Sequence, residues 1–192
     1  LPTDDGLYFS VSAWLNGPLY RTQGTPETTI QLTDADQKVF GEHLVEFDGE
    51  VYFNGRDVNR ERQPTLPGSG LMKTSGTPES TDYVLVADRR DTQSRILGVW
   101  DGLLHHEFRN RSGLINYRVT DGTPEGTVQP ADYEGGLEGS TIHGELGDTL
   151  IGIVPDGLGS ELALFPKSSL TPQIVEINPA APSDPFNFFI QD

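Results

Sequence analysis

The sequence predicts an all-β domain, a four-bladed β-propeller, and three observations lead to this fold class. The phrase Gly-Thr-Pro-Glu recurs at Gly24, Gly76 and Gly122, with spacings of 76 − 24 = 52 and 122 − 76 = 46 residues. Short apolar alternations lie between turn signals, and no long segment keeps the 3.6-residue apolar period of a helix. Four strands fit into each repeat, and four antiparallel strands make one propeller blade.

A hairpin is expected near the start of each unit. Residues 44–53, 96–104 and 142–153 each read as two apolar strands around a tight turn. The turns are Asp48-Gly49, Asp101-Gly102 and Gly147-Asp148; Asp-Gly is a strong signal for a type I′ turn, which needs positive φ at both central residues. Their first residues are spaced 101 − 48 = 53 and 147 − 101 = 46, close to the spacings of the repeated phrase.

The repeated phrase follows as the third strand and its turn, at residues 19–27, 71–79 and 117–125, with an eroded copy at 163–169. In Thr-x-Gly-Thr-Pro-Glu, Gly can adopt a φ that other residues rarely adopt, and the ring of Pro fixes its own φ. The Thr side chain can hydrogen-bond to nearby backbone groups. Fourth strands are expected at 28–32 and 81–86. The predicted blades are roughly residues 1–40, 41–92, 93–138 and 139–182.

The two ends of the chain suggest how the ring closes. Asp5-Gly6 begins a hairpin, but residues 1–4 are too few for its first strand. An apolar strand near the C-terminus is left over, formed by Phe186, Asn187, Phe188, Phe189 and Ile190. We expect residues 185–192 to complete the first blade and remove an open sheet edge. The same strand could instead be donated to a neighbouring molecule, which gives a filament, or the chain could be part of a longer array.

The amino-acid composition limits the classes of partner and of chemistry that we expect for this chain. The 29 acidic and 13 basic residues give a net charge of −16, which disfavours nucleic acid and anionic membranes. There is no cysteine, so disulfides and thiolate chemistry are excluded. No apolar run is long enough to span a membrane. The chain begins at Leu1 without a charged and apolar leader, which we interpret as a processed or excised fragment from which any export signal has been removed.

These residues resemble the bacterial ELWxxDGT-type repeat, over nearly the full chain. Residues 117–127 keep Thr-Asp-Gly-Thr and a later Gly-Thr, 7–10 and 51–53 resemble its Leu-Tyr-Phe strand, and 161–162 and 176–179 resemble its opening and exit. The chain departs from the consensus where Trp becomes Tyr20 and Met72, where Asp becomes Gln23 and Ser75, and at 163–169. The resemblance implies β-propeller-like repeats of the kind found in large exported bacterial proteins, whose roles are unassigned.

Two histidines are the candidate metal or anion ligands. His43 and His143 occupy corresponding first-strand positions in the second and fourth blades, so both could face a central tunnel; the alternative is that they are ordinary strand residues. His105 and His106 are adjacent on one strand, and should face opposite sides. The sequence contains no His-Glu-x-x-His, Gly-x-Ser-x-Gly or phosphate-binding loop. No cofactor is predicted, although a bound Ca²⁺ or other ion is left open, with Asp34/Asp36 and Asp132/Glu134 as the densest loop acids.

Two further features concern the surface. Asn110 begins the only Asn-x-Ser/Thr sequon and is a candidate glycosylation site. Arg56, Arg60 and Arg62 mark a long polar insertion at 54–70, the best candidate for a partner-contacting loop.

The function that we predict is a non-catalytic extracellular repeat domain for binding, adhesion or surface assembly. Its partners would be other surface proteins, glycans or copies of itself. One alternative is a filament subunit that donates its terminal strand. Another is a carbohydrate-binding propeller or a glycosidase, in which two carboxylates would meet across the tunnel.

Overall fold

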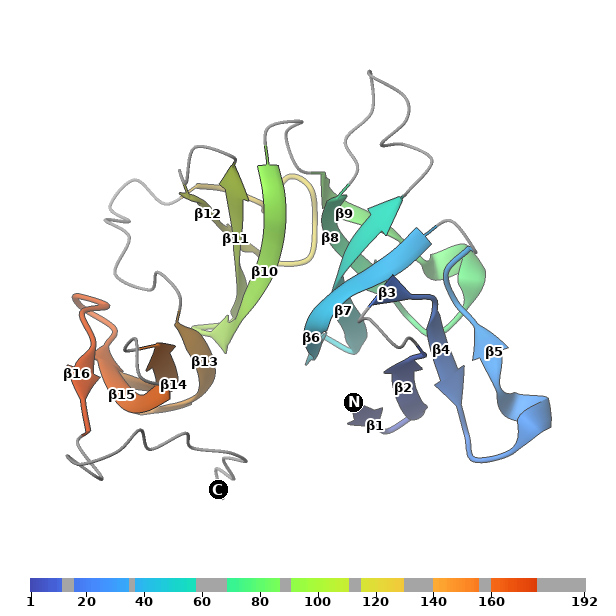
Figure 1. Ribbon diagram of the computed structural model, residues 1–192, viewed down its shortest axis with the longest axis horizontal. Coiled ribbons are helices and arrows are strands. Elements are labelled where there is room, and N and C mark those ends of the chain that lie inside the picture. The colour runs from blue at the N-terminus through green and yellow to red at the C-terminus, as the bar shows by residue number, and fades with distance from the viewer. Residues whose placement is uncertain are drawn as a thin grey trace. The chain divides into compact units, whose positions relative to one another are not determined.

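The computed structural model describes residues 1–11, 16–34, 37–57, 69–86, 91–110, 115–129, 140–155 and 160–175. These residues form an all-β structure of four antiparallel sheets (Figure 1). The helical structure among them is limited to two 3-10 turns, Pro26–Thr28 and Pro78–Ser80. The all-β prediction is confirmed.

The first sheet has the order β1-β2-β4-β5, and the second has the order β3-β6-β7-β8-β9. The strands of the first sheet are β1 (Pro2–Thr3), β2 (Gly6–Ser10), β4 (Leu19–Thr22) and β5 (Ile30–Gln31). Those of the second are β3 (Asn16–Gly17), β6 (Gln37–Phe47), β7 (Glu50–Asp57), β8 (Ser69–Thr74) and β9 (Asp82–Val86).

The third sheet has the order β10-β11-β12, and the fourth has the order β13-β14-β15-β16. The third consists of β10 (Asp91–Trp100), β11 (Leu103–Asn110) and β12 (Ile115–Thr120). The fourth consists of β13 (Thr141–Leu146), β14 (Thr149–Pro155), β15 (Ser160–Pro166) and β16 (Gln173–Ile174).

The chain divides into two compact units, which we describe separately. The first unit, Leu1–Ile96 with Leu103–Gln129, holds the first two sheets and most of the third. The second unit, Leu97–Gly102 with Pro130–Asp192, holds the fourth sheet and the end of the β10–β11 hairpin.

The predicted tight turns are present. Asp48 and Gly49 have φ of 51° and 74°, and Asp101 and Gly102 have φ of 52° and 70°. Positive φ at both central residues is the signature of the type I′ turn that Asp-Gly predicts. Gly147 also has a positive φ, of 58°.

One expectation about the N-terminus is wrong. Residues 2 and 3 do form a first strand, because Pro2 and Thr3 of β1 pair with Leu7 and Gly6 of β2. The pairing continues to Leu1, whose ammonium donates to the carbonyl of Tyr8 at 2.8 Å. The proposed closing strand, Phe186 to Ile190, lies outside the described residues.

The repeated phrase folds alike in its copies. Gly24, Gly76 and Gly122 have φ of 100°, 94° and 94°, which strongly favours glycine. The threonine two residues earlier accepts a hydrogen bond from each glycine amide, as Thr74 Oγ1 does from Gly76 at 3.1 Å. The predicted turn chemistry of Gly and Thr is therefore confirmed.

The four sheets can be aligned residue by residue through the register in which their strands pair. One position is equivalent in all four sheets, and it is occupied by Tyr8, Tyr52, His105 and Ile151. Each of these residues pairs with the residue three positions before the phrase glycine or, in the fourth sheet, before Lys167. The paired residues are, in the same order, Arg21, Lys73, Val119 and Leu164. We call the face that carries this position the downstream face of a sheet, and the opposite face the upstream face.

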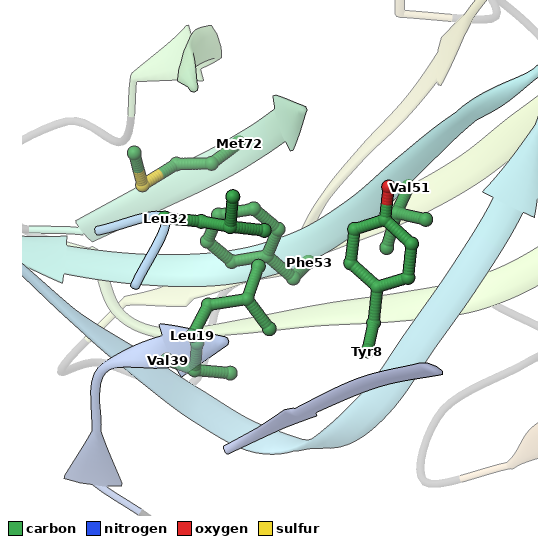
Figure 2. Packing of buried hydrophobic residues seen from close by; sticks show 7 residues of the cluster. All are labelled: Tyr8, Leu19, Leu32, Val39, Val51, Phe53 and Met72. Atoms are coloured by element: carbon green, nitrogen blue, oxygen red, sulfur yellow. The ribbon is translucent and has the colours of Figure 1, made fainter. Parts of the chain in front are cut away.

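The main described core lies between the first two sheets. Tyr8 and Leu19, on the downstream face of the first sheet, pack with Val51, Phe53 and Met72, on the upstream face of the second. Figure 2 shows these side chains with Leu32 and Val39 of the same cluster. Phe53 and Met72 are completely buried. Stacked sheets that bury one apolar face against the next are what the repeat predicts.

Candidate functional site

The repeated turn makes the contact between the first and second sheets. Tyr8 donates to Asp5 Oδ2 at 2.9 Å, and Arg21 Nη1 donates to the carbonyl of Gly76 at 3.0 Å. Arg21 also pairs with Asp5 at 3.3 Å. A Cβ on Gly76 would lie 2.7 Å from Tyr8 Oη, so the tyrosine of one sheet rests on the glycine of the next. Burial, reinforced by Asp5, raises the pKa of Tyr8 to about 12, so its hydroxyl stays protonated.

The second and third sheets meet in the same way. A Cβ on Gly122 would collide with Tyr52 Oη, and Tyr52 is the counterpart of Tyr8. An ion pair again lies beside the tyrosine: Lys73 Nζ is 2.6 Å from Glu50 Oε2. Burial and the nearby Glu50 carboxylate raise the pKa of Tyr52 to about 12. The phrase glycine is therefore a docking point for the preceding sheet.

The third sheet carries different chemistry on its downstream face. His105 stands at the tyrosine position and is hydrogen-bonded through Nδ1 to the hydroxyl of Tyr117. Glu107, only 5% exposed, accepts from Arg95 Nε at 3.1 Å, and Arg95 Nη2 lies 3.0 Å from the same oxygen. This arginine–glutamate pair lies two residues beyond His105 on β11, whereas the acids of the earlier ion pairs, Asp5 and Glu50, precede Tyr8 and Tyr52. A buried pair of this kind is costly to break from one side.

The upstream face of β11 carries the cluster with the strongest resemblance to catalytic chemistry. His106 is completely buried, and its Nε2 lies 2.9 Å from Ser94 Oγ on β10 and 3.1 Å from Asn54 Oδ1 on β7. Ser94 Oγ donates to Asn54 Oδ1 at 2.8 Å. Phe108 also packs in this cluster, with its ring edge-on to that of His106 and the two ring centroids 4.4 Å apart. A serine, a histidine and an amide thus meet between the second and third sheets.

The hydrogen bonds of this cluster do not suit nucleophilic catalysis. Asn54 Oδ1 accepts from both neighbours, so Nε2 of His106 carries the proton and cannot take one from Ser94. A catalytic histidine is also oriented by an acceptor at its other nitrogen, whereas Nδ1 of His106 has no hydrogen-bond partner among the described residues. Burial lowers the pKa of His106 to about 3, so the ring is neutral at ordinary pH. The arrangement fits a polar contact between sheets.

The fourth sheet has a lysine in place of the phrase glycine. Lys167 Nζ lies 2.6 Å from Asp101 Oδ1, in the β10–β11 turn, and 2.7 Å from Glu145 Oε2 on β13. Hydrogen bonds to these two carboxylates raise the pKa of Lys167. Within the second unit, an ion pair therefore occupies the place that a tyrosine–glycine contact has in the first.

The residues singled out from the sequence do not form one site among the described residues. His143 lies exposed in β13, at an irregularity of register between Ile142 and Gly144. His43 lies in β6, where the register also shifts between Val39 and Leu44, but its side chain is outside the described part. The two histidines belong to different units, so their tunnel pairing stays a prediction.

The surface candidates fall at the ends of strands. Asn110 is the last residue of β11 and Arg56 is near the end of β7; the side chain of Asn110 is outside the described part. Arg60 and Arg62 also lie outside the described residues, as do the loop acids Asp36, Asp132 and Glu134. No group of three or more His, Asp or Glu side chains that could hold a metal ion occurs in the described ranges. Within the same ranges, none of the helical segments has the length and apolar character to cross a membrane.

Sequence reasoning missed the partners of the two adjacent histidines. It placed His105 and His106 on opposite faces, and they do have different partners. It did not find Asn54, Ser94 or Tyr117, because these come from three other strands. Alignment of β11 with β2 and β7 would have placed His105 at the position of Tyr8 and Tyr52 and marked it as a junction residue.

Comparisons with known proteins add little. No family model and no curated protein matches the chain, so its resemblance to ELWxxDGT-type repeats stays a prediction. Among solved structures, an oligogalacturonate lyase in complex with manganese is similar, with a TM-score of 0.47 and 12% identity. The match covers 89% of this chain and 50% of that chain, so the chain spans half the length of the lyase. A similarity this distant neither establishes nor excludes an enzymatic activity.

Proposed function

We propose that this chain is a non-catalytic, extracellular or cell-surface repeat domain for binding, adhesion or surface assembly. One observation carries the proposal. The side chains most suited to catalysis, Ser94 and His106, bond to Asn54 of the neighbouring sheet, and His106 is completely buried. Side chains with these hydrogen bonds connect one repeat to the next. The acidic surface keeps such a domain soluble.

The proposed architecture is that of a four-bladed propeller. It is supported by the shared register of the four sheets and by tyrosine–glycine contacts at two successive junctions. Closure by residues 186–190 and donation of that strand to a neighbour are the two alternatives for the C-terminal segment. Deletion of residues 185–192 tests closure: a closed ring would lose cooperative unfolding, whereas an unchanged melting curve would contradict closure.

The test of function pairs a binding panel with an activity screen. Immobilised protein is probed with a glycan array and with extracellular proteins, and we expect saturable binding to at least one of them. The same protein is incubated with polysaccharides, and we expect no time-dependent release of reducing ends. Release that is lost on Glu107→Gln or Ser94→Ala would overturn the non-catalytic proposal in favour of the glycosidase alternative. Binding to none of the probes would count against adhesion.

A further inference from the structure

The dipeptide Asp-Gly occurs at several places in this chain, and its surroundings differ between them. The pairs are Asp5-Gly6, Asp48-Gly49, Asp101-Gly102, Asp121-Gly122 and Asp156-Gly157, the last of which lies outside the described residues. An aspartate before glycine isomerises readily, because glycine has no side chain to shield its amide nitrogen and leaves the backbone free to rotate. The fold therefore decides which of the described pairs can react.

The reaction needs a free carboxyl group and a free amide. The glycine nitrogen attacks Cγ of the protonated aspartate, and the carboxyl OH leaves with the amide proton as water. Water then opens the resulting succinimide ring at either carbonyl carbon, which restores aspartate or gives isoaspartate, whose main chain runs through Cγ. One water is lost and one is gained, so the mass does not change. A cation or hydrogen-bond donor beside the carboxylate opposes the reaction, because it favours the ionised form.

Two of the described aspartates are protected in the first unit. The carboxylate of Asp5 has three side-chain partners, namely Thr3, Tyr8 and Arg21. Asp121 Oδ1 accepts from the amide of Thr123 at 2.9 Å and from its hydroxyl at 2.8 Å. The attacking nitrogen is occupied as well, because the amide of Gly122 donates to Thr120 Oγ1 at 3.0 Å.

Asp48 and Asp101 give a matched comparison, because they occupy the same position in the same kind of turn. Their φ values are 51° and 52°, those of the glycines that follow are 74° and 70°, and both aspartates are exposed. Asp101 Oδ1 lies 2.6 Å from Lys167 Nζ, within the second unit. The carboxylate of Asp48, in the first unit, has no hydrogen bond or ion pair to any residue that the structure describes.

We propose that Asp48 is a site of spontaneous modification, at which Asp48-Gly49 isomerises to isoaspartate, while Asp5, Asp101 and Asp121 are protected by their partners. The proposal goes beyond the proposed function, which assigns no covalent change to the chain. An isoaspartyl carboxylate is the group that isoaspartyl methyltransferases esterify with S-adenosylmethionine. The modified chain therefore also carries a recognition site for this class of enzyme.

The position of Asp48 connects this change to the junction between the second and third sheets. Only two residues separate the paired Phe47 and Glu50 in the β6–β7 turn, and isoaspartate adds one carbon to the main chain there. Glu50 follows the turn, and its carboxylate lies beside Tyr52, which rests on Gly122. A displaced Glu50 should therefore loosen the contact of Tyr52 with the third sheet.

Prolonged incubation of the whole chain at physiological temperature tests the proposal. Isoaspartate is counted by enzymatic transfer of a labelled methyl group from S-adenosylmethionine, and it is located by fragmentation of proteolytic peptides. We expect it to form at Asp48 several-fold faster than at Asp5, Asp101 or Asp121. In denaturing urea, where the partners are lost, all four should convert at similar rates.

Two variants test the physical cause. Lys167→Met removes the cation beside Asp101 and leaves its turn unchanged, so Asp101 should then convert at a rate close to that of Asp48. Asp5 and Asp121 should stay protected in this variant, which shows that the chain is still folded. Asp48→Asn keeps a residue that suits the turn and forms the same ring with loss of ammonia. Its reaction should be faster and is read from the change in mass, which also separates the natural Asn16-Gly17 and Asn54-Gly55 pairs from Asp48.

The effect on the junction is measured on the modified chain itself. Protein with isoaspartate at position 48 is separated by hydrophobic-interaction chromatography and unfolded in urea beside the unmodified protein. Its unfolding midpoint should be lower, and an unchanged midpoint would contradict the link to the Tyr52 junction.

Two results would overturn the proposal as a whole. Isoaspartate that is absent from Asp48, or that forms as fast at Asp101 in the wild type, would show that a free carboxylate does not select the site. A Lys167→Met chain in which Asp101 stays as slow as in the wild type would show the same. Neither result depends on ligand binding, so this proposal and the proposed function fail separately.

Discussion

Gly76 offers a direct test of the junction between the first two sheets, and Gly24 is its matched control. Both glycines occupy the same place in the repeated turn, with φ of 94° and 100°. An added Cβ at Gly76 would lie 2.7 Å from Tyr8 Oη, 2.8 Å from Arg21 Nη1 and 2.9 Å from Asp5 Oδ2. The same atom at Gly24 would meet nothing within 4 Å.

The expected magnitudes follow from this difference. Alanine at either position is forced into a backbone conformation that costs about 1–3 kcal/mol. Gly76→Ala must in addition displace Tyr8, which is 1% exposed and has little room to move; overpacking of this kind costs about 1–3 kcal/mol more. The difference between the two variants therefore isolates the sheet-to-sheet contact from the backbone strain.

The assay is urea unfolding followed by circular dichroism and by Tyr fluorescence. Gly76→Ala should lower the free energy of unfolding more than Gly24→Ala. Tyr8→Phe combined with Gly76→Ala should recover part of the loss, because the nearest colliding atom is gone. Equal losses for the two alanine variants, with no recovery in the double variant, would refute the junction.

Four further predictions concern other contacts. His106 has a pKa of about 3 when folded and about 6.5 when unfolded, so only the unfolded chain binds its proton between these values; stability should fall by about 2–3 kcal/mol between pH 6.5 and 4.5, and urea unfolding across pH should show that His106→Gln flattens this part of the slope. Asn54→Leu leaves Ser94 and His106 without their shared acceptor, and thermal unfolding should show a loss of about 2–4 kcal/mol; an unchanged melting temperature would contradict the cluster. Thr77→Ala removes the side chain that accepts from the Ser80 amide at 3.3 Å, and calorimetry should show a loss of about 1 kcal/mol. Lys167→Met should lower the melting temperature, with a difference from wild type that shrinks as NaCl is raised, and a salt-independent difference would argue against the ion pairs.

Much of the fold could be predicted because local rules determine it. Asp48-Gly49 and Asp101-Gly102 form the turns that their positive φ requires, and the phrase glycines adopt positive φ in each copy. The spacing of these signals gave the number of sheets. The short strand Pro2–Thr3 was missed, because two residues carry too little pattern to predict a strand.

The site could not be predicted in full because Asn54 comes from another sheet. Ser94 and His106 lie on β10 and β11, the neighbouring strands of one hairpin, and are twelve residues apart, so hairpin register relates them. No spacing rule links either residue to Asn54, since that contact arises only when the second and third sheets stack. The missing signal was alignment of the repeats at single-residue resolution, which assigns each side chain to an upstream or a downstream face.

The central claim is that the buried polar residues of β11 hold sheets together and perform no catalysis. The most direct measurement is the nitrogen NMR spectrum of the His106 ring as the pH is lowered. The account predicts one neutral tautomer, with the proton on Nε2 and no titration until the protein unfolds. Titration of the folded protein between pH 5 and 8, or a ring with the proton on Nδ1 beside Ser94, would contradict it.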